Sequence, residues 1–313
     1  MKTISLMSPS LFNRLIEAED DSPVDDTEYS LWLDRGANYS PAVKLKIKKE
    51  LPSGVYKISF DNQEGNFIFT PASVNTDEIY RFSESISDQI LKEVDDFWDR
   101  EEIYKKYNFT HKRGLLLEGP AGNSKTSTIN LLINQLLERK GLIFLVNSLK
   151  EFQVLYEALP TIVRKIEPTR PIITIIEDID QIITANSGND SEILDLLDGK
   201  QAINHHLVIM TSNNTSELSE ALLRPSRIDM RFVLEVPSKQ VRKEYLEKKG
   251  IPEDKLEEYA TKTEGMSFAQ LKEVFISTMI LGKDIDKTVD KITNPLESKD
   301  YLAKGTNKVK IGI

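Results

Sequence analysis

The chain contains no cysteine among its 313 residues, which excludes disulfide bonds, thiolate metal sites and a cysteine nucleophile. Long apolar runs are missing too. No stretch approaches the roughly 18 to 20 apolar residues of a membrane-spanning helix, and the N-terminus lacks the apolar core of a signal peptide. We therefore expect a cytoplasmic protein with no membrane association.

Histidine is scarce, with His111, His205 and His206 as the only examples. Neighbouring residues of a strand point to opposite faces, so His205 and His206 cannot both point inward. The pair favours a solvated start of a strand over a zinc centre. Positive charge is also in deficit, because the net charge is −9. This disfavours a nucleic-acid protein that relies on overall basicity, although a local basic groove or pore stays compatible with it.

Residues 1 to about 80 differ in pattern from the rest of the chain. Residues 43–47 alternate apolar side chains with lysines, and residues 55–60 pair as a hairpin with residues 66–70. We predict a small β-rich N-terminal domain. The alternating lysines of this domain are Lys44, Lys46 and Lys48. They favour a solvated strand face over a face that binds nucleic acid.

The chain is organised around residues 113–127, in which three leucines precede a short loop and the start of a helix. A glycine-containing loop lets backbone N–H groups surround phosphate oxygens, and the helix N-terminus adds a positive dipole end. Lys125 then reaches the outer phosphates and the Thr126 hydroxyl ligates Mg²⁺, while Ser124 replaces the usual glycine. The candidate nucleotide ligands are Gly119, Pro120, Ala121, Gly122, Asn123, Ser124, Lys125, Thr126 and Ser127.

Strand and helix patterns alternate after this loop, which predicts a parallel, doubly wound sheet. The expected strands are residues 142–146, 172–176, 207–211 and 232–236. We expect an α/β fold of the P-loop NTPase type with a C-terminal helical lid. The expected domains are the β-rich N-terminal domain (1–80), a linker helix (81–112), the large α/β subdomain (113–237), the lid (238–295) and a tail (296–313).

Two acids, Glu177 and Asp178, follow the apolar strand at residues 172–176. Nucleotide hydrolysis needs one carboxylate near Mg²⁺ and a second that activates the attacking water, and this position suits both. Asn213 follows the next strand and can orient water, or form a turn. Arg224 and Arg227 can stabilise charge on a transferring phosphoryl group, or form surface salt bridges.

The ordered set of motifs resembles an AAA ATPase over residues 107–280. Besides the loop, the similar segments are residues 175–180, 196–199, 211–213, 221–229 and 263–269. The order of Glu177 and Asp178 is reversed from the family's usual aspartate then glutamate, as in the branch similar to the mitochondrial AAA translocase of the Rieske protein. The junction from residue 97 to 114 is similar to bacteriophage and bacterial AAA proteins.

The resemblance implies a role for each matching residue. Glu177 and Thr126 serve the metal, Asp178 is the base, and Asn213 is the sensor beside the γ-phosphate. Arg224 and Arg227 are fingers that reach the nucleotide of a neighbouring subunit. The resemblance thus implies ATP and Mg²⁺ as cofactors and a homo-oligomeric ring, a hexamer, as the active form.

The function implied is ATP-driven remodelling or translocation of a protein partner that residues 1–80 recruit. Two alternatives stay open: a nucleic-acid motor or loader, and a nucleotide-gated scaffold with slow hydrolysis. The segment between residues 146 and 172 has no glycine, and we expect Phe152 and Tyr156 in the core. It therefore lacks the pore loop of AAA unfoldases, which favours handling of a folded or partly folded partner.

Overall fold

A computed structural model of the chain describes residues 29–34, 39–45, 48–63, 65–74, 82, 85–186, 190–198 and 203–294. The strands in these ranges are β1 (Tyr29–Asp34), β2 (Tyr39–Leu45), β3 (Gly54–Asp61), β4 (Asn66–Pro71), β5 (Lys112–Glu118), β6 (Leu142–Val146), β7 (Ile172–Ile176), β8 (His206–Ser212) and β9 (Met230–Val233). The α-helices are α2 (Ile86–Asp99), α3 (Glu101–Lys106), α4 (Lys125–Glu138), α5 (Leu149–Ala158), α6 (Arg164–Ile166), α7 (Ile179–Ala185), α8 (Ser191–Asp198), α9 (Lys239–Lys248), α10 (Glu253–Lys262), α11 (Phe268–Phe275) and α12 (Ile285–Thr293). Three short helical turns are η1 (Leu159–Val163), η2 (Thr215–Glu217) and η3 (Ile276–Ile280).

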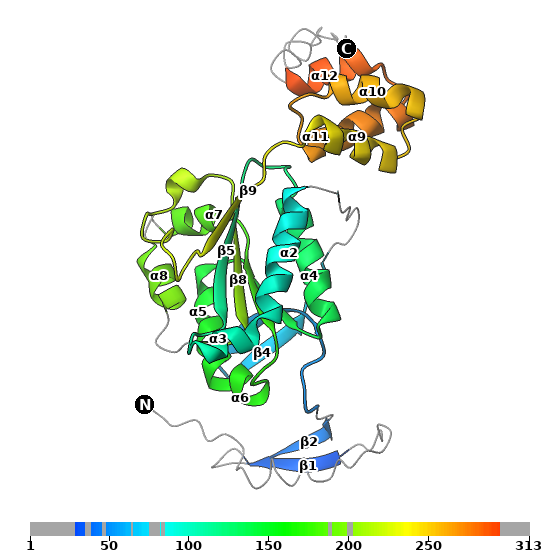
Figure 1. Ribbon diagram of the computed structural model, residues 1–313. Coiled ribbons are helices and arrows are strands. Elements are labelled where there is room, and N and C mark those ends of the chain that lie inside the picture. Colours follow the sequence, from blue (N-terminus) through cyan, green and yellow to red (C-terminus); the bar gives the residue numbers. More distant parts are fainter. Residues whose placement is uncertain are drawn as a thin grey trace, which may run out of the picture.

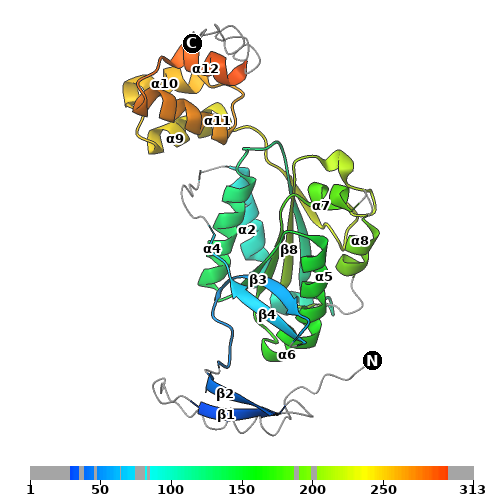
Figure 2. The ribbon, with the colours of Figure 1, turned by 180° about the vertical axis from the view of Figure 1, so that it is seen from behind.

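The central element is a seven-stranded sheet in the order β4-β3-β6-β7-β8-β5-β9. Neighbouring strands from β3 to β9 are parallel, and the hairpin of β3 and β4 adds an antiparallel edge. Helices α2 and α4 cover one face, and α5, α7 and α8 cover the other (Figure 1 and Figure 2). This is the predicted α/β fold, in which the carboxyl ends of the parallel strands meet at one edge of the sheet.

Burial along the strands follows from the apolar patterns. All five residues of β7 are buried, as the unbroken apolar run at residues 172–176 predicts for a strand covered on both faces. The cluster beneath α2 and α4 contains Phe97 and Trp98. The cluster on the opposite face contains Phe152 and Tyr156 of α5, so the core placement predicted for this pair is confirmed.

After β9 the chain folds as the helices α9 to α12, which share an apolar core of their own. Ser238 caps α9, and Ser267 forms the predicted capping box with Gln270 at the start of α11. Phe82, which precedes α2, joins this core and stacks on Phe268 with ring centroids 5.4 Å apart. The lid therefore packs against Phe82, a residue that precedes α2 in the chain.

The structure moves the boundary of the predicted N-terminal domain. The hairpin at residues 55–60 and 66–70 is present as β3 and β4, yet β3 pairs in parallel with β6 and so belongs to the central sheet. Tyr56 and Ile58 of β3 supply the reason, because both are buried in the cluster that also contains Phe144 of β6. Among the described residues, β1 and β2 form a separate two-stranded sheet.

Two other boundaries also differ. The predicted linker helix is two helices, α2 and α3, and α2 is part of the core rather than a connection between domains. The strand predicted at residues 232–236 is Met230–Val233 instead. Asp229 N donates to Gly114 O at 2.8 Å and thereby sets where β9 begins beside β5.

The prediction of a solvated strand start at the histidine pair is wrong for His206. This side chain is fully buried, and its Nε2 lies 2.9 Å from Thr174 Oγ1. Burial lowers the pKa of His206 well below its usual value, because the charged form is poorly solvated there.

The predicted tail at residues 296–313 lies outside the described residues. Within the described ranges, no helix has the length and apolarity to cross a membrane.

The position of β3 in the sheet gives a test by truncation. A chain that starts at residue 48 keeps all seven strands, and we expect its melting temperature to stay close to that of the full chain. A chain that starts at residue 75 loses β3 and β4, including Val55 and Ile58, each worth about 1.5–3 kcal/mol of burial. That loss is large against a total stability of about 5–15 kcal/mol, so we expect an unfolded or aggregating product. Thermal unfolding followed by circular dichroism measures the melting temperature of each truncated chain. Equal melting temperatures for the two truncated chains would contradict the assignment of β3 to the central sheet.

Candidate active site

A cavity of about 690 Å³ opens where β5, β7 and β8 end, between the edge of the sheet and the lid. Its volume falls within the roughly 300–1,000 Å³ of typical small-molecule sites. The sheet side carries the loop after β5, the two acids after β7, and Asn213 after β8. The lid side is more apolar and includes Tyr245 of α9 and Phe268 of α11. The predicted phosphate loop and the predicted acids therefore face one cavity.

The loop between β5 and α4 has the backbone conformation that a tight phosphate-binding turn requires. Gly119 and Gly122 have positive φ angles of 148° and 83°. A Cβ atom on Gly119 would lie 2.3 Å from the carbonyl oxygen of Leu234, so only glycine fits there. Ser124 has a φ of 66°, a left-handed conformation that costs a residue with a side chain about 1–2 kcal/mol. A glycine at this position avoids that cost, which explains the usual pattern.

Lys125 begins α4, and three oxygen atoms hold its ammonium group over the loop. Its Nζ donates to the carbonyl oxygens of Gly119 and Pro120 and, at 2.7 Å, to Asn213 Oδ1. Burial lowers the pKa of Lys125, and the negative charge of Asp178 acts in the opposite direction. The ammonium group thus lies at the N-terminus of a helix, where negative charge on a ligand is stabilised.

Asp178 follows β7 in a left-handed conformation, with φ of 50°, which aspartate tolerates better than most residues. Its backbone N–H donates to Thr211 Oγ1 at 2.8 Å, and Asn213 Nδ2 donates to Asp178 Oδ1 at 2.7 Å. Lys125, Asn213 and Asp178 thus form one hydrogen-bonded chain across the ends of three strands. The chain fixes the amide orientation of Asn213, because an ammonium can only donate and a carboxylate can only accept.

Glu177 lies next to this chain and lines the same cavity. Burial raises the pKa of its carboxyl group, and the charge of Asp178 raises it further. Thr126 in the first turn of α4 also lines the cavity. Magnesium prefers oxygen ligands such as carboxylates and hydroxyls. Thr126 and Glu177, which were predicted as metal ligands, therefore face the same space.

Arg224 and Arg227 are not among the residues that line the cavity. One guanidinium edge of Arg227 binds Asp198 at the end of α8: Nε donates to Oδ1 at 2.8 Å and Nη2 donates to Oδ2, while Nη1 donates to the carbonyl oxygen of Ala221. Arg224 is exposed. Gly114 N donates to Asp229 Oδ2 at 2.8 Å, and a Cβ atom on Gly114 would overlap the carbonyl oxygen of Arg227. The segment that carries the arginines is thus fixed to the start of β5, away from the cavity.

Most of the predicted site residues come together in space. Those that line the cavity are Ala121, Gly122, Asn123, Ser124, Lys125, Thr126, Ser127, Glu177, Asp178 and Asn213. Gly119 and Pro120 contribute through the carbonyl oxygens that bind Lys125. Within this chain, the two arginines are the predicted residues that the fold keeps apart from the rest.

Sequence reasoning gave no role to four residues that shape the site. Thr211 positions the backbone of Asp178, and a hydroxyl residue close to the end of a buried strand is the signal for it. Phe82, Tyr245 and Phe268 line the cavity from outside the sheet. Phe268 lies in residues 263–269, one of the segments that carry the family resemblance, whereas no local pattern marks Phe82 and Tyr245. All three are distant in the chain from the loop that they face.

Comparison with known proteins agrees with this geometry. Residues 115–236 match the family described as "ATPase family associated with various cellular activities (AAA)". The ATP-dependent zinc metalloprotease FtsH 1 of Phytoplasma mali (strain AT) is 27% identical over 270 residues, which cover 80% of this chain and 43% of that protein.

Two further relatives show a similar pattern. The Cell division cycle protein 48 homolog of Archaeoglobus fulgidus is 25% identical over 228 residues, covering 67% of this chain and 30% of that protein. A protein of Bifidobacterium dentium named "AAA ATPase forming ring-shaped complexes" is 29% identical over 172 residues, which cover 46% of this chain and 32% of that protein. The chain thus spans less than half the length of each of these curated relatives.

The conformation of Ser124 predicts that Ser124→Gly stabilises the protein. Relief of the left-handed strain of about 1–2 kcal/mol offsets the roughly 0.5–1 kcal/mol entropic cost of a glycine, for a net gain of up to about 1.5 kcal/mol. Ser127→Gly is the matched control, because Ser127 lies within α4, where glycine costs about 0.5–1 kcal/mol. Urea unfolding of both variants measures the difference. A loss of stability in both variants would contradict the strain argument.

Proposed function

Since residues 115–236 form an ATPase domain of the AAA family, we propose that the chain hydrolyses ATP as a subunit of a homo-oligomeric ring and uses the energy to remodel or translocate a protein partner. The observation that carries the proposal is the hydrogen-bonded chain of Lys125, Asn213 and Asp178 at the mouth of a phosphate-binding loop. Such a chain links a phosphate-contacting ammonium to a carboxylate that can accept a proton from water.

The residues present fit a nucleotide with its magnesium ion. The loop backbone and the N-terminus of α4 suit the phosphates, and Lys125 reaches them from the helix start. Thr126 and Glu177 would hold Mg²⁺, which neutralises charge that develops on the phosphates. The apolar lid side of the cavity, with Tyr245 and Phe268, suits a nucleobase.

Asp178 is the proposed general base, and Asn213 is its positioning partner. The hydrogen bond from Asn213 Nδ2 holds the Asp178 carboxylate, and Thr211 fixes the backbone that carries it. An aspartate is one methylene shorter than the glutamate usual at this position. Because the shorter side chain has less reach, the position of the Asp178 carboxylate depends on its fixed backbone. With that backbone held by Thr211, the reversed order of the two acids is compatible with hydrolysis.

The variant Asp178→Asn tests this role. Asparagine tolerates the left-handed backbone and keeps the shape of the side chain, so we expect ATP binding to stay and turnover to fall by about 10²- to 10⁴-fold. Phosphate release measures turnover, and a fluorescent nucleotide measures binding. Asp286→Asn, on the exposed surface of α12, is the control that keeps both. Turnover of Asp178→Asn equal to that of the unchanged protein would rule out Asp178 as the base.

The same variant tests the protein partner. Loaded with ATP, it should retain proteins that the nucleotide-free Lys125→Ala variant releases. The separate sheet of β1 and β2 lies outside the ATPase fold, which supports recruitment of the partner by the N-terminal segment. A chain that starts at residue 48 should therefore hydrolyse ATP without retaining the partner. Equal capture of partner proteins by Asp178→Asn, by Lys125→Ala and by the chain that starts at residue 48 would contradict nucleotide-dependent binding.

Ring assembly follows from the position of the arginines. Neither Arg224 nor Arg227 lines the cavity of its own subunit, and Asp198 holds the guanidinium of Arg227 in a fixed direction. An arginine that stabilises transferring phosphate must come from a neighbouring subunit in such an arrangement. The relative named for ring-shaped complexes supports the same assembly. The number of subunits that we propose is six.

We predict that ATPase activity per subunit rises with protein concentration and that Arg227→Ala or Arg224→Ala lowers it. Arginines supplied by a neighbour are worth roughly 10³- to 10⁵-fold in turnover. Arg100→Ala is the matched control, because Arg100 lies in an exposed ion pair with Asp96 at the far end of α2. Steady-state assays over a dilution series measure the effect. Activity that is independent of dilution and unaffected by both substitutions would remove the ring from the proposal.

Protease activity is not part of this proposal, although several relatives are named as metalloproteases. The 313 residues contain no His-Glu-x-x-His sequence, the motif with which such enzymes bind zinc and activate water. The activity that the cavity supports is therefore hydrolysis of a nucleotide.

A further inference from the structure

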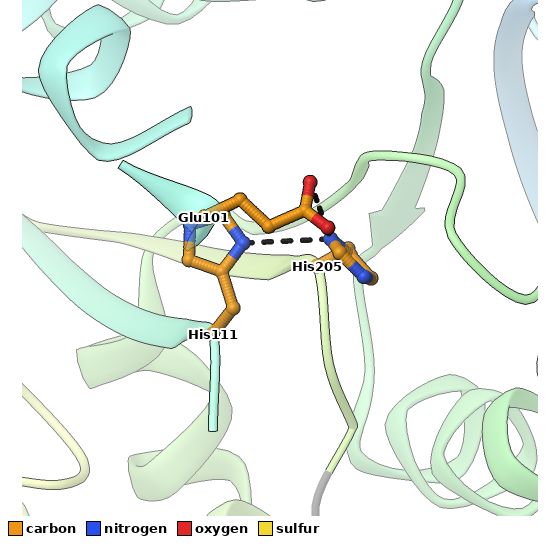
Figure 3. A group of neighbouring side chains, drawn as sticks. All are labelled: Glu101, His111 and His205. Carbon is orange, nitrogen blue, oxygen red and sulfur yellow. Dashed lines mark hydrogen bonds and ion pairs between the residues drawn. The ribbon is translucent and has the colours of Figure 1, made fainter. Parts of the chain in front are cut away.

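Glu101, His111 and His205 meet at the end of the sheet opposite to the nucleotide cavity. Glu101 begins α3, His111 directly precedes β5, and His205 directly precedes β8. β5 and β8 are neighbours in the sheet, which places the residues before them side by side. Figure 3 shows the three side chains turned toward one another from these separate elements.

Two of the three separations between the donor atoms are close to those around a tetrahedral metal ion. His205 Nδ1 lies 3.5 Å from His111 Nδ1 and 3.5 Å from Glu101 Oε2, and all three donor atoms lie within 4.8 Å of one another. Bonds of about 2.0–2.1 Å from zinc to nitrogen or oxygen place tetrahedral ligands about 3.3–3.4 Å apart. The two shorter separations need to close by only a few tenths of an ångström. The third, between His111 and Glu101, is at most 4.8 Å and closes by rotation of the Glu101 side chain, which is 46% exposed.

The hydrogen bonds of His111 leave the correct nitrogen free for a metal. Its Nε2 lies 2.9 Å from the carbonyl oxygen of Phe97. A carbonyl can only accept, so Nε2 carries the proton and Nδ1 of the neutral ring keeps its lone pair. Metal-binding histidines usually donate their second ring nitrogen to a backbone carbonyl or a carboxylate in this way.

The surroundings are apolar on one side and open on the other. His111 is 3% exposed and is enclosed by Phe97, Trp98 and Tyr104, with ring centroids 4.2, 5.9 and 4.8 Å away. The side chain of Glu101 is 46% exposed. An ion therefore has a path to the site, and a water molecule has room to complete its coordination.

We propose that Glu101, His111 and His205 form a binding site for a divalent transition-metal ion, with zinc as the ion that fits best. Two imidazole nitrogens and one carboxylate oxygen suit zinc, whereas magnesium and calcium prefer oxygen ligands alone. The ion ties α3 to the starts of β5 and β8, and a water molecule is its fourth ligand. The site is separate from the nucleotide cavity, so it does not depend on the proposed ATPase function.

The balance of protons at the site is simple. Without an ion, His205 must carry its proton on Nδ1, because two lone pairs 3.5 Å apart repel each other and because Glu101 accepts that proton. With an ion, His205 carries the proton on Nε2, and Nδ1 binds the metal. Both tautomers of His205 are neutral, so the change between them neither adds nor removes a proton.

The test is a zinc titration of the full chain, stripped of metal and nucleotide, in competition with a chromogenic chelator. We expect one equivalent of zinc per chain. His205→Ala and Glu101→Gln should weaken binding by more than the roughly 10- to 100-fold that loss of an outer hydrogen-bond partner costs at metal sites. Glu102→Gln is the matched control, because Glu102 is an exposed neighbour outside the cluster, and it should bind zinc like the unchanged protein.

Cobalt serves as a second probe, because tetrahedral Co²⁺ gives strong visible absorption that should appear with the unchanged protein and vanish with His205→Ala. Circular dichroism checks the fold of each variant, and Glu101→Gln, at the surface, keeps the test valid if His205→Ala unfolds. The proposal fails if the unchanged protein takes up no zinc, which would leave a structural hydrogen-bonded cluster. It fails equally if Glu101→Gln and His205→Ala bind zinc like the unchanged protein. It also fails if Glu177→Gln abolishes zinc uptake while Glu101→Gln and His205→Ala retain it.

Discussion

The hydrogen-bonded chain from Lys125 through Asn213 to Asp178 is the interaction on which the candidate active site depends. It connects the ends of β5, β8 and β7, which are neighbours in a parallel sheet and therefore deliver their following residues to one edge. Each member limits the next: the ammonium sets the orientation of the amide, and the amide sets the position of the carboxylate. The site is thus pre-organised by the sheet before any ligand binds.

Two residues in left-handed conformations support this arrangement at a cost. Ser124 and Asp178 both have positive φ, and each lies where a strand or loop turns into a helix. The surrounding packing maintains them, as the contact between Gly119 and Leu234 and the hydrogen bond from Asp178 to Thr211 show. Strain of this kind, held by a rigid sheet, is frequent at functional sites.

The lid reaches the same loop by direct contact. A Cβ atom on Gly122 would lie 3.0 Å from the Cβ of Ala269 and 3.1 Å from Ser267 Oγ, and Ala269 N donates to Gly122 O at 3.4 Å. The start of α11 therefore packs against the turn between β5 and α4. A shift of the lid would move this turn as well, which gives the lid and the sheet domain a physical means of coupling. At the other end of the sheet, Glu101, His111 and His205 join α3 to two strands without touching this machinery.

The sequence by itself determined the parts of the molecule that are local. The loop with Lys125, the unbroken apolar strand before Glu177 and the capping box at Ser267 each depend on residues a few positions apart, so their patterns were sufficient. Tertiary structure decided the rest. The membership of β3 in the central sheet, the ion pair of Arg227 with Asp198, and the meeting of His111 with His205 join residues far apart in the chain. No local pattern encodes such contacts, because strand order and helix packing, set by burial of both faces of the sheet, decide which distant side chains become neighbours.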